Sequence, residues 1–430
     1  MGDFLQTLVN AVTIGSLYAL IALGYTMVYG ILQLINFAHS DIVVLGAWVS
    51  YTLATFLLPR MGIDVDSAPW YAGGAILIAS MILCGAIGFC IERLAYKPIR
   101  RAPRLNALIT AIGVSLFLQN TGQLHYTIIP AEKQLAAGKV LDRGTDPKSI
   151  KLDAPITIGS GNEYQLRLQA ADATTPTVRK IISPPATYER NQELMLDQPI
   201  GRAQTRDASF TLVSISSPLQ LPFGAMPAGM PHLMPDNELW RHEFNTSIRN
   251  EDGTISSIAK PVRITGIDAT IVGTALLLMI GLEMLIFHTR LGMAMRAVSF
   301  NFDTAGLMGI AVDRIISITF VTGAALAAAA GFLYAIKYQQ IQQPAHQTWV
   351  LLGLKAFVAA VIGGIGNVRG AAIGGFLIAF IEQFSGVYLQ RFLHWDNAAA
   401  FTDVYVFALL ILMLLVRPRG LFGSTVREKV

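Results

Sequence analysis

The chain of 430 residues is 53% hydrophobic and only 14% charged, with a mean hydropathy of +0.51. A soluble globular domain carries about 25% charged residues, so this composition excludes an ordinary soluble domain and indicates a membrane protein. The net charge of +4 is small for a chain of this length, and we expect no nucleic-acid partner.

Nine apolar ranges are candidates for membrane-spanning helices, because a span needs about 20 mostly apolar residues. Five of them are clearly apolar, and the other four are less clean and contain Gly, Asn or Gln, as broken or re-entrant helices do. The clear ranges are 8–32, 70–92, 268–288, 315–336 and 401–416, and the others are 42–58, 105–121, 349–365 and 370–389. The pattern predicts an all-α polytopic membrane protein with about eight or nine transmembrane helices, including broken or re-entrant segments.

Basic residues set the expected orientation, because loops rich in Lys and Arg stay on the cytoplasmic side. Five basic residues lie from Arg93 to Arg104, with only Glu92 against them. We therefore expect this loop to be cytoplasmic, together with the loop 289–314 and the C-terminal tail. Counting spans between these points places residues 122–265 outside the cell membrane. The N-terminus is also outside if all nine ranges cross, and one re-entrant range would reverse it.

Residues 122–265 are too long and too polar for a plain loop. Within them, 122–262 contains 13 of the 19 prolines. The alternating stretches YQLRLQA at 164–170 and SFTLVSISSPLQL at 209–221 predict strands. A small β-rich domain is favoured over the alternative, a disordered insert. The predicted domains are the N-terminal helices 1–121, the extracytoplasmic insert 122–265 and the C-terminal helices 266–430.

The stretch INFAHSDI at 35–42 is a polar interruption between two apolar ranges. Asn36 is a plausible helix N-cap. His39 and Asp41 are ionisable groups near membrane depth, where such groups indicate a functional site. We therefore consider Asn36, His39 and Asp41 candidates for lining a translocation path. The alternative is a capped turn at the membrane interface.

Three charged residues, Glu283, Lys355 and Glu382, lie within apolar ranges. Lys355 and Glu382 are further candidates for the translocation path. The alternative is structural pairing, and Lys355 could also extend outward along its own chain. Glu283 lies seven residues before Arg290, so we expect these two residues on one face of a helix.

The stretch VIGGIGNVRGAAIGG at 361–375 contains six glycines. Glycine is unfavourable in helix interiors, so the helix should break here. Broken helices within a bilayer line a cavity or are covered by protein, and in transporters they often shape the substrate path. Gly363, Gly364 and Gly366 are therefore path candidates. The alternative is a tight turn between two spans at the cytoplasmic face, which Arg369 supports.

The polar segment RLGMAMRAVSFNFDTAGLMGIAVDR at 290–314 separates two long apolar ranges and contains a short helical piece that ends at Gly309. An ordered surface of this kind on the cytoplasmic side indicates an attached partner. The chain lacks a GxxxxGK[ST] phosphate loop, an HExxH motif, paired CxxC motifs and a serine elbow. We therefore expect no enzymatic activity, no metal site and no cofactor.

Several long segments, in order along the chain, resemble the LivH-type permease family. This family supplies one of the two membrane subunits of the bacterial ABC importer for branched-chain amino acids. The resemblance covers about two-thirds of the chain, and the connection at 122–262 is much shorter in most members. The segments are GSLYALIALGYTMVYGILQLINFAHSD at 15–41, IERLAYKPIRRAPRLNALITAIGVSLFLQN at 91–120, MGIAVDRIISITFVTGAALAAAAGFL at 308–333, GLKAFVAAVIGGIGNVRGAAIGG at 353–375 and FALLILMLLVRPRGLFG at 407–423.

The resemblance implies a multi-pass permease of the bacterial inner membrane that imports branched-chain or related hydrophobic amino acids. Its implied partners are a second permease subunit, two ATP-binding subunits, an extracytoplasmic solute-binding protein and membrane lipid. Urea, short amides or other small polar solutes are the alternative cargo, because relatives of this permease type carry them. A docking or sensing subunit and a stand-alone passive channel are further alternatives.

The resemblance also implies a cytoplasmic coupling helix, often near an EAA-xxx-G pattern, that docks in a groove of the ATPase. Asp303, Thr304 and Ala305, followed by Gly309, resemble this pattern, with Asp for Glu and Thr for the first Ala. Asp303 suits a helix N-terminus, and Gly309 can end the helix. With Arg296, these residues are the predicted ATPase-coupling group. The alternative is an ordinary amphipathic loop helix.

Overall fold

The computed structural model describes both helical halves and a large part of the insert. The described residues are 2–32, 36–63, 68–100, 102–122, 125–128, 133–144, 146, 148–153, 156–157, 163–170, 177–181, 187–188, 192–200, 208–215, 219–222, 230, 233–234, 237–249, 255–338, 345–393 and 401–423.

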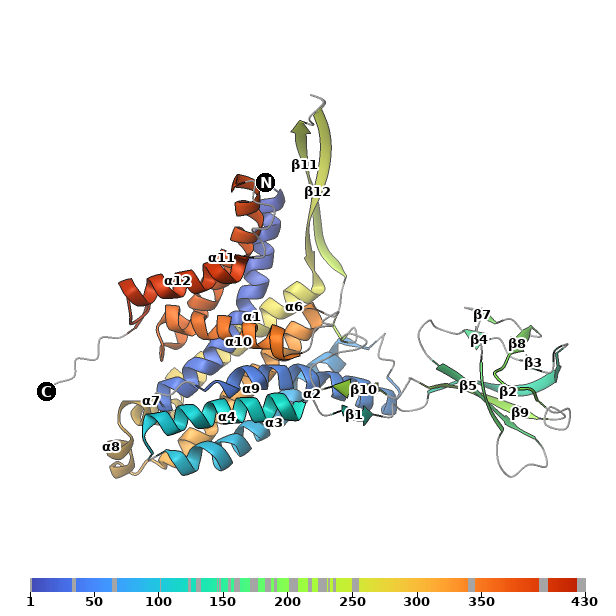
Figure 1. The fold of residues 1–430 in the computed structure, drawn as a ribbon, viewed down its shortest axis with the longest axis horizontal. Coiled ribbons are helices and arrows are strands. Elements are labelled where there is room, and N and C mark those ends of the chain that lie inside the picture. Colours follow the sequence, from blue (N-terminus) through green and yellow to red (C-terminus); the bar gives the residue numbers. More distant parts are fainter. Residues whose placement is uncertain are drawn as a thin grey trace. The chain divides into compact units, whose positions relative to one another are not determined.

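Helices occupy every range predicted to cross the membrane (Figure 1). Within the described residues, α1, α2, α3, α6, α9 and α11 are long and apolar enough to span a bilayer, and the apolar stretches of α4, α10 and α12 are shorter. The all-α polytopic fold with a β-rich insert is confirmed. These helices are α1 (Gly2–Leu32), α2 (Ala38–Arg60), α3 (Trp70–Ile91), α4 (Arg104–Gly122), α6 (Gly266–His288), α9 (Val312–Lys337), α10 (Ala345–Gly363), α11 (Val368–Leu393) and α12 (Thr402–Val416).

Small residues allow these helices to pack closely, as is common between helices in lipid. A Cβ atom on Gly331 of α9 would lie 2.0 Å from the carbonyl oxygen of Val43 in α2. A Cβ atom on Gly375 of α11 would lie 2.5 Å from the backbone nitrogen of Ala19 in α1. Both glycines are therefore required by direct backbone contact within this chain.

Contacts at the helix ends show how α1 and α6 run relative to α11. At one end of the bundle, Phe4 at the start of α1 contacts Phe384 near the end of α11, with ring centroids 5.5 Å apart. At the opposite end, Arg369 at the start of α11 donates to Glu283 near the end of α6, at 2.6 Å. Helices α1 and α6 therefore run antiparallel to α11, and the N-terminus lies away from the end that contains Arg369.

The segment between α6 and α9 contains two short helices, α7 (Arg290–Phe300) and α8 (Phe302–Leu307), rather than the one helical piece that the sequence suggested. Thr289 separates α6 from α7 and caps α7 by accepting a hydrogen bond from the backbone of Gly292. The expected pairing of Glu283 with Arg290 on one helix face is wrong, because the helix breaks at Thr289.

The basic segment after α3 continues as a π-helical turn (Glu92–Tyr96) and a 3-10 turn (Lys97–Ile99). The Glu92 side chain is fully buried, and it accepts hydrogen bonds from Arg100 and from Ser317 of α9. Arg100 also contacts Asp313, with 2.6 Å between nitrogen and oxygen. These contacts fasten the end of α3 to the start of α9.

The insert contains a six-stranded antiparallel sheet in the order β6-β5-β9-β2-β3-β8. The stretch 164–170 forms most of β5, and 209–221 contains β9 and part of β10. The strands are β1 (His125–Ile128), β2 (Lys133–Arg143), β3 (Ser149–Leu152), β4 (Ile156–Thr157), β5 (Glu163–Gln169), β6 (Thr177–Lys180), β7 (Thr187–Tyr188), β8 (Glu193–Met195), β9 (Ser209–Ile215), β10 (Leu219–Pro222), β11 (Glu238–Arg249) and β12 (Ile255–Thr265).

Alternation along the strands builds a hydrophobic core in this sheet. Tyr164, Leu166 and Leu168 of β5 are buried, and so are Phe210 and Leu212 of β9. Every second side chain of a strand points to the same face, which is why alternation indicated strands here. The sheet therefore has a core of its own.

The chain divides into two compact units, and the insert is shared between them. One unit contains residues 125–221 together with 55–63. The other contains the remaining helices and residues 222–430, including the β11–β12 hairpin. This hairpin leads directly into α6, whose first turn is fixed by a capping box between Thr265 and Asp268.

Candidate translocation pathway and coupling site

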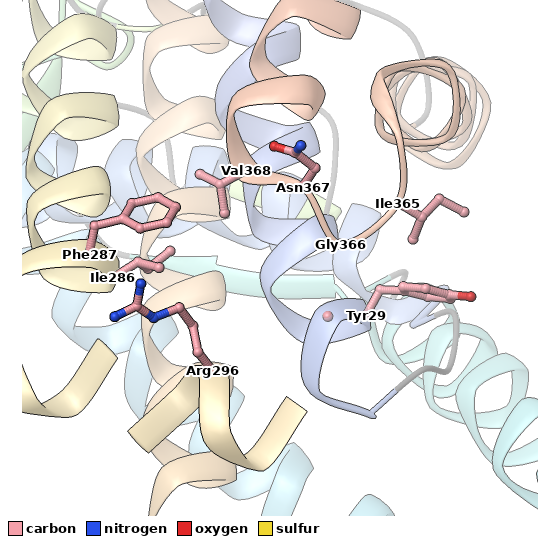
Figure 2. A pocket seen from close by; sticks show the side chains of 9 residues that line it. Tyr29, Ile286, Phe287, Arg296, Ile365, Gly366, Asn367 and Val368 are labelled. Carbon is pink, nitrogen blue, oxygen red and sulfur yellow. The ribbon is translucent and has the colours of Figure 1, made fainter. Parts of the chain in front are cut away.

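A partly open pocket of about 500 Å³ lies among the ends of α1 and α6, helix α7 and the turn between α10 and α11 (Figure 2). It brings together Arg296, a predicted coupling residue, and Gly366, a predicted path residue. Neither Gly363 nor Gly364 lines it. The lining residues are Tyr29, Gly30, Ile286, Phe287, Arg296, Ile365, Gly366, Asn367 and Val368.

The turn between α10 and α11 is tight and also forms one wall of this pocket. Gly364 and Gly366 have φ angles of 109° and 88°, in the region that favours glycine. Asn367 caps α11, since its side chain accepts from the Gly370 backbone at 3.1 Å, and it also donates to the carbonyl of Phe422 at 2.9 Å. A tight turn and a path-lining segment were the alternatives for this stretch, and the geometry is compatible with both.

Two arginines contact the aromatic ring of Phe287 at the pocket. The guanidinium carbons of Arg296 and Arg369 lie 5.3 Å and 5.2 Å from the ring centroid. Arg369 is neutralised by Glu283, whereas Arg296 forms no ion pair among the described residues. The pocket therefore carries an uncompensated positive charge at Arg296.

A second cavity lies next to the pocket and is lined by Tyr25, Thr26, Tyr29, Asn36, Phe357, Ala360 and Ile365. Its volume of about 10 Å³ leaves room for about one water molecule. Tyr29 and Ile365 line both cavities, so the two cavities adjoin at these residues.

Asn36 and His39 lie inside the protein and not at an exposed interface. Both side chains are buried. The Asn36 carboxamide oxygen accepts from the Tyr96 hydroxyl at 2.6 Å. His39 lies 3.3 Å from the carbonyl oxygen of Ile21 through Nε2 and packs edge-on against Tyr25. Asn36 reaches the small cavity, and Tyr25 connects His39 to the same cavity wall.

Asp41 is a buried carboxyl group that receives only neutral donors. It is 5% exposed. Oδ1 accepts a hydrogen bond from the Gln119 side chain of α4 at 3.0 Å, and Oδ2 has no hydrogen-bond partner among the described atoms. Within the described part of the chain, no basic side chain pairs with Asp41. Nor do the described residues contain a group of three His, Cys, Asp or Glu side chains that could hold a metal ion.

Lys355 and Glu382 are paired with each other and lie outside the lining of both cavities. The Lys355 ammonium lies 3.0 Å from Glu382 Oε1 and 2.7 Å from Asp403 Oδ1, and Tyr18 donates to Glu382 Oε2 at 2.7 Å. The Lys355 side chain is only 12% exposed, so it does not extend outward. Asp403 and Tyr18 were missed, because nothing in the local sequence indicates a partner on another helix.

The predicted coupling residues Asp303, Thr304 and Ala305 lie on α8, between two well-defined ends. Asn301 caps the helix, with its side chain accepting from the Thr304 backbone at 2.9 Å. Asp303 lies in the first turn, where a carboxylate is favourable, and Ala305 is buried.

Gly309 closes this segment with a φ angle of 83°. The Gly309 N–H donates to the carbonyl of Gly306 at 3.0 Å, and the Ile310 N–H donates to that of Ala305 at 3.1 Å. This pair of bonds is the Schellman arrangement, in which glycine is preferred at the left-handed position.

Large apolar side chains are exposed at the end of α7 and at the end of α8. Phe300, Leu307 and Met308 are 81%, 88% and 79% exposed. Sequence reasoning overlooked them, although each lies within two residues of an end of α8. Exposed apolar groups of this kind mark contacts with a partner when they gather on one surface.

Residues 7–137 and 237–415 match the family described as "Branched-chain amino acid transport system / permease component". The chain belongs to this family. The match covers nearly all of the helical residues, together with β1, the start of β2 and the β11–β12 hairpin, and between its two parts it omits residues 138–236. Most of the six-stranded sheet therefore lies in the unmatched interval.

Curated relatives extend this similarity along the whole chain. LivH of Escherichia coli (strain K12), a high-affinity branched-chain amino acid transport system permease protein, is 32% identical over 427 residues, which cover 99% of this chain and 98% of LivH. BraD of Pseudomonas aeruginosa, of the same description, is 32% identical over 428 residues with the same coverage. LsrC of Yersinia pseudotuberculosis, an autoinducer 2 import system permease protein, is 33% identical over 129 residues, or 29% of this chain and 35% of LsrC. No solved structure matches the chain.

Proposed function

We propose that this permease is a transmembrane subunit of an ABC importer in the bacterial inner membrane, and that it carries branched-chain or related hydrophobic amino acids. The observation that carries the proposal is the end-to-end similarity to LivH and BraD, whose names assign them to the transport of these amino acids. The chain would supply the membrane passage, and ATP hydrolysis would take place on two separate ATP-binding subunits.

The α8 segment is the proposed contact with an ATPase. It is a short helix with both ends fixed, and the exposed apolar side chains of Leu307 and Met308 follow it. The bonds that close α8 at Gly309 lead directly into α9, which is fastened to α3 through Asp313 and Arg100. A movement imposed on α8 would therefore reach two long helices.

The proposed path runs from the buried group Asn36, His39 and Asp41 through the small cavity, which Asn36 alone of the three lines, to the 500 Å³ pocket. On this path, Tyr29 and Ile365 stand between the two cavities and would stop a solute there. ATP-driven switching has to move these two side chains apart. Such switching requires contacts that differ between the inward-open and outward-open states. The second permease subunit would form the other side of the passage.

The insert is proposed to lie on the extracytoplasmic side, where the solute-binding protein docks. The basic segments mark the opposite end of the helices as cytoplasmic. The N-terminal end of α1 hydrogen-bonds to β12 through Gln6 and Arg263, so the hairpin lies at the end away from α8.

ATP-dependent uptake in proteoliposomes tests the proposal. The vesicles would contain this chain, its partner permease, the ATPases and the binding protein, with labelled leucine and with unlabelled urea and amides as competitors. We expect leucine uptake that only similar amino acids inhibit. Uptake of urea or amides in place of leucine would keep the importer mechanism and reject the amino-acid cargo.

The similarity to LsrC is the observation that keeps a different cargo open, because its named solute differs from that of LivH and BraD. Two other roles predict different outcomes in the same vesicles. A passive channel would give flux without the ATPases. A sensing subunit would retain uptake after deletion of residues 122–262 and lose its signalling output.

A further inference from the structure

The 500 Å³ pocket combines one charged group with apolar walls. Arg296 is the charged residue among those that line it. Ile286, Phe287, Ile365 and Val368 supply apolar surface. Tyr29 and Asn367 add neutral polar groups to the lining. Pockets that bind small molecules combine apolar walls with a few polar groups that fix the orientation of the ligand.

The charge at Arg296 is free to bind an anion. Its neighbour Arg369 is neutralised by Glu283, and Arg296 has no ion pair among the described residues. The Phe287 ring holds the Arg296 guanidinium at the pocket wall, as Figure 2 shows. A guanidinium presents two parallel N–H groups that match the two oxygens of a carboxylate.

We propose that this pocket is a binding site for the transported amino acid on the cytoplasmic side of the passage, with the carboxylate at Arg296 and the aliphatic side chain against the apolar walls. The inference rests on the proposed function and names the chemical groups by which this end of the path recognises its cargo. It also gives Arg296 a role separate from direct contact with the ATPase.

The position of the pocket supports this role. Tyr29 and Ile365 line both this pocket and the small cavity that Asn36 reaches. A solute that has passed these two side chains enters the pocket and meets Arg296 before it leaves the protein.

Protection of a reporter cysteine tests the site in the assembled importer. Val368→Cys would be placed in a Cys84→Ala, Cys90→Ala background and labelled with N-ethylmaleimide, in nanodiscs of phosphatidylcholine without ATP. Leucine and 4-methylpentanoate, which carry the carboxylate, should slow labelling. Leucinamide, which has the same side chain without a carboxylate, should not slow it at equal concentration.

Arg296→Gln should raise the concentration of 4-methylpentanoate needed for half protection by about tenfold or more, because a charge-assisted hydrogen bond is lost. Arg296→Lys should retain part of the protection, since it keeps the charge without the planar fork. Arg290→Gln is the matched control, because Arg290 lies on the same helix but does not line the pocket. Unchanged half protection in Arg296→Gln, or equal protection by leucinamide, would overturn the site.

The same assay distinguishes a cargo site from a lipid site and from a pocket without a role in recognition. Protection by added phosphatidylglycerol without any amino acid would assign the pocket to a lipid headgroup and overturn the cargo site. If leucine is imported normally but protection does not depend on Arg296, the binding site is rejected and the proposed function stands. Carboxylate protection at Arg296 in an importer that takes up no leucine would reject the proposed cargo while the anion site stands.

Discussion

Lys355 with its partners and Asp41 are both ionisable groups within the helical body, and they differ in how their charges are compensated. Lys355 lies between Glu382 and Asp403, and Glu382 also accepts from Tyr18. Asp41 receives a hydrogen bond from the neutral Gln119 and has no basic partner among the described residues. The first group joins four helices, whereas the second borders the proposed path.

This difference predicts a structural role for the charges around Lys355 and a functional role for Asp41. A buried charge with an ion-pair partner is stable where it is, and removing one partner leaves the other uncompensated. A buried carboxyl group without such a partner is costly, and it persists where a proton, a cation or a solute uses it. Substitutions in the two groups should therefore differ in both the size and the kind of their effects.

Lys355→Met should have the largest effect, because it leaves Glu382 and Asp403 without their shared cation. Loss of one partner of a buried ion pair costs about 3–5 kcal/mol. We expect a clear fall in the melting temperature of the purified complex and less protein in the membrane. Lys355→Met combined with Glu382→Gln should recover part of the loss. An unchanged melting temperature in the single variant would contradict the structural role.

Asp41→Asn should leave the fold intact and impair transport. The side chain keeps its shape and its contact with Gln119, so melting should change little. We expect ATP-dependent uptake to fall by roughly tenfold, as for the loss of one charged hydrogen bond of about 1.5 kcal/mol. Uptake at the wild-type rate, measured in the same vesicles, would place Asp41 with the structural charges.

Gly309 and Gly62 allow a similar comparison for backbone conformation, between a position with a proposed function and a position without one. Both have positive φ angles, 83° and 75°, with open space around them, but only Gly309 follows the proposed coupling helix. Valine at either position should introduce local strain of about 1–2 kcal/mol. Gly309→Val should weaken co-purification of the ATPases and reduce uptake, with membrane insertion preserved. Equal losses in Gly62→Val would mean that strain alone, and not coupling, is responsible.

Asp403→Asn should have the smallest effect. The Asp403 side chain is 37% exposed, and its removal leaves the neutral pair of Lys355 and Glu382. Partly exposed ion pairs contribute up to about 1 kcal/mol, so the melting temperature should shift only slightly. A loss as large as that of Lys355→Met would show that Asp403 is the main partner of the lysine.

The helices were predictable because each carries its own signal. A run of about 20 apolar residues identifies a span without reference to the rest of the chain. Alternation identified β5 and β9 for the same reason. The break at Thr289 was harder to predict, because a capping threonine within a continuous polar segment gives only a weak local signal.

The candidate site was only partly predictable. The glycines of the turn between α10 and α11 and the pattern around Asp303 are local features. The sequence placed Arg296 with the coupling residues, and the structure places it at a pocket wall on Phe287, with Gly366 on another wall. Tyr29 and Ile365 carried no sequence signal, because their importance comes from the two cavities they share.

The sequence by itself determined that this protein is a multi-pass helical permease with a β-rich insert, because hydropathy, alternation and family motifs are properties of contiguous residues. Only the tertiary structure decided which polar groups are compensated and which are not. Tyr18 meets Glu382 across 364 residues of chain and Lys355 meets it across 27, while Asp41 meets no cation in the part of the chain that the structure describes. Compensation depends on distances between side chains in space, and a sequence does not contain those distances until it folds.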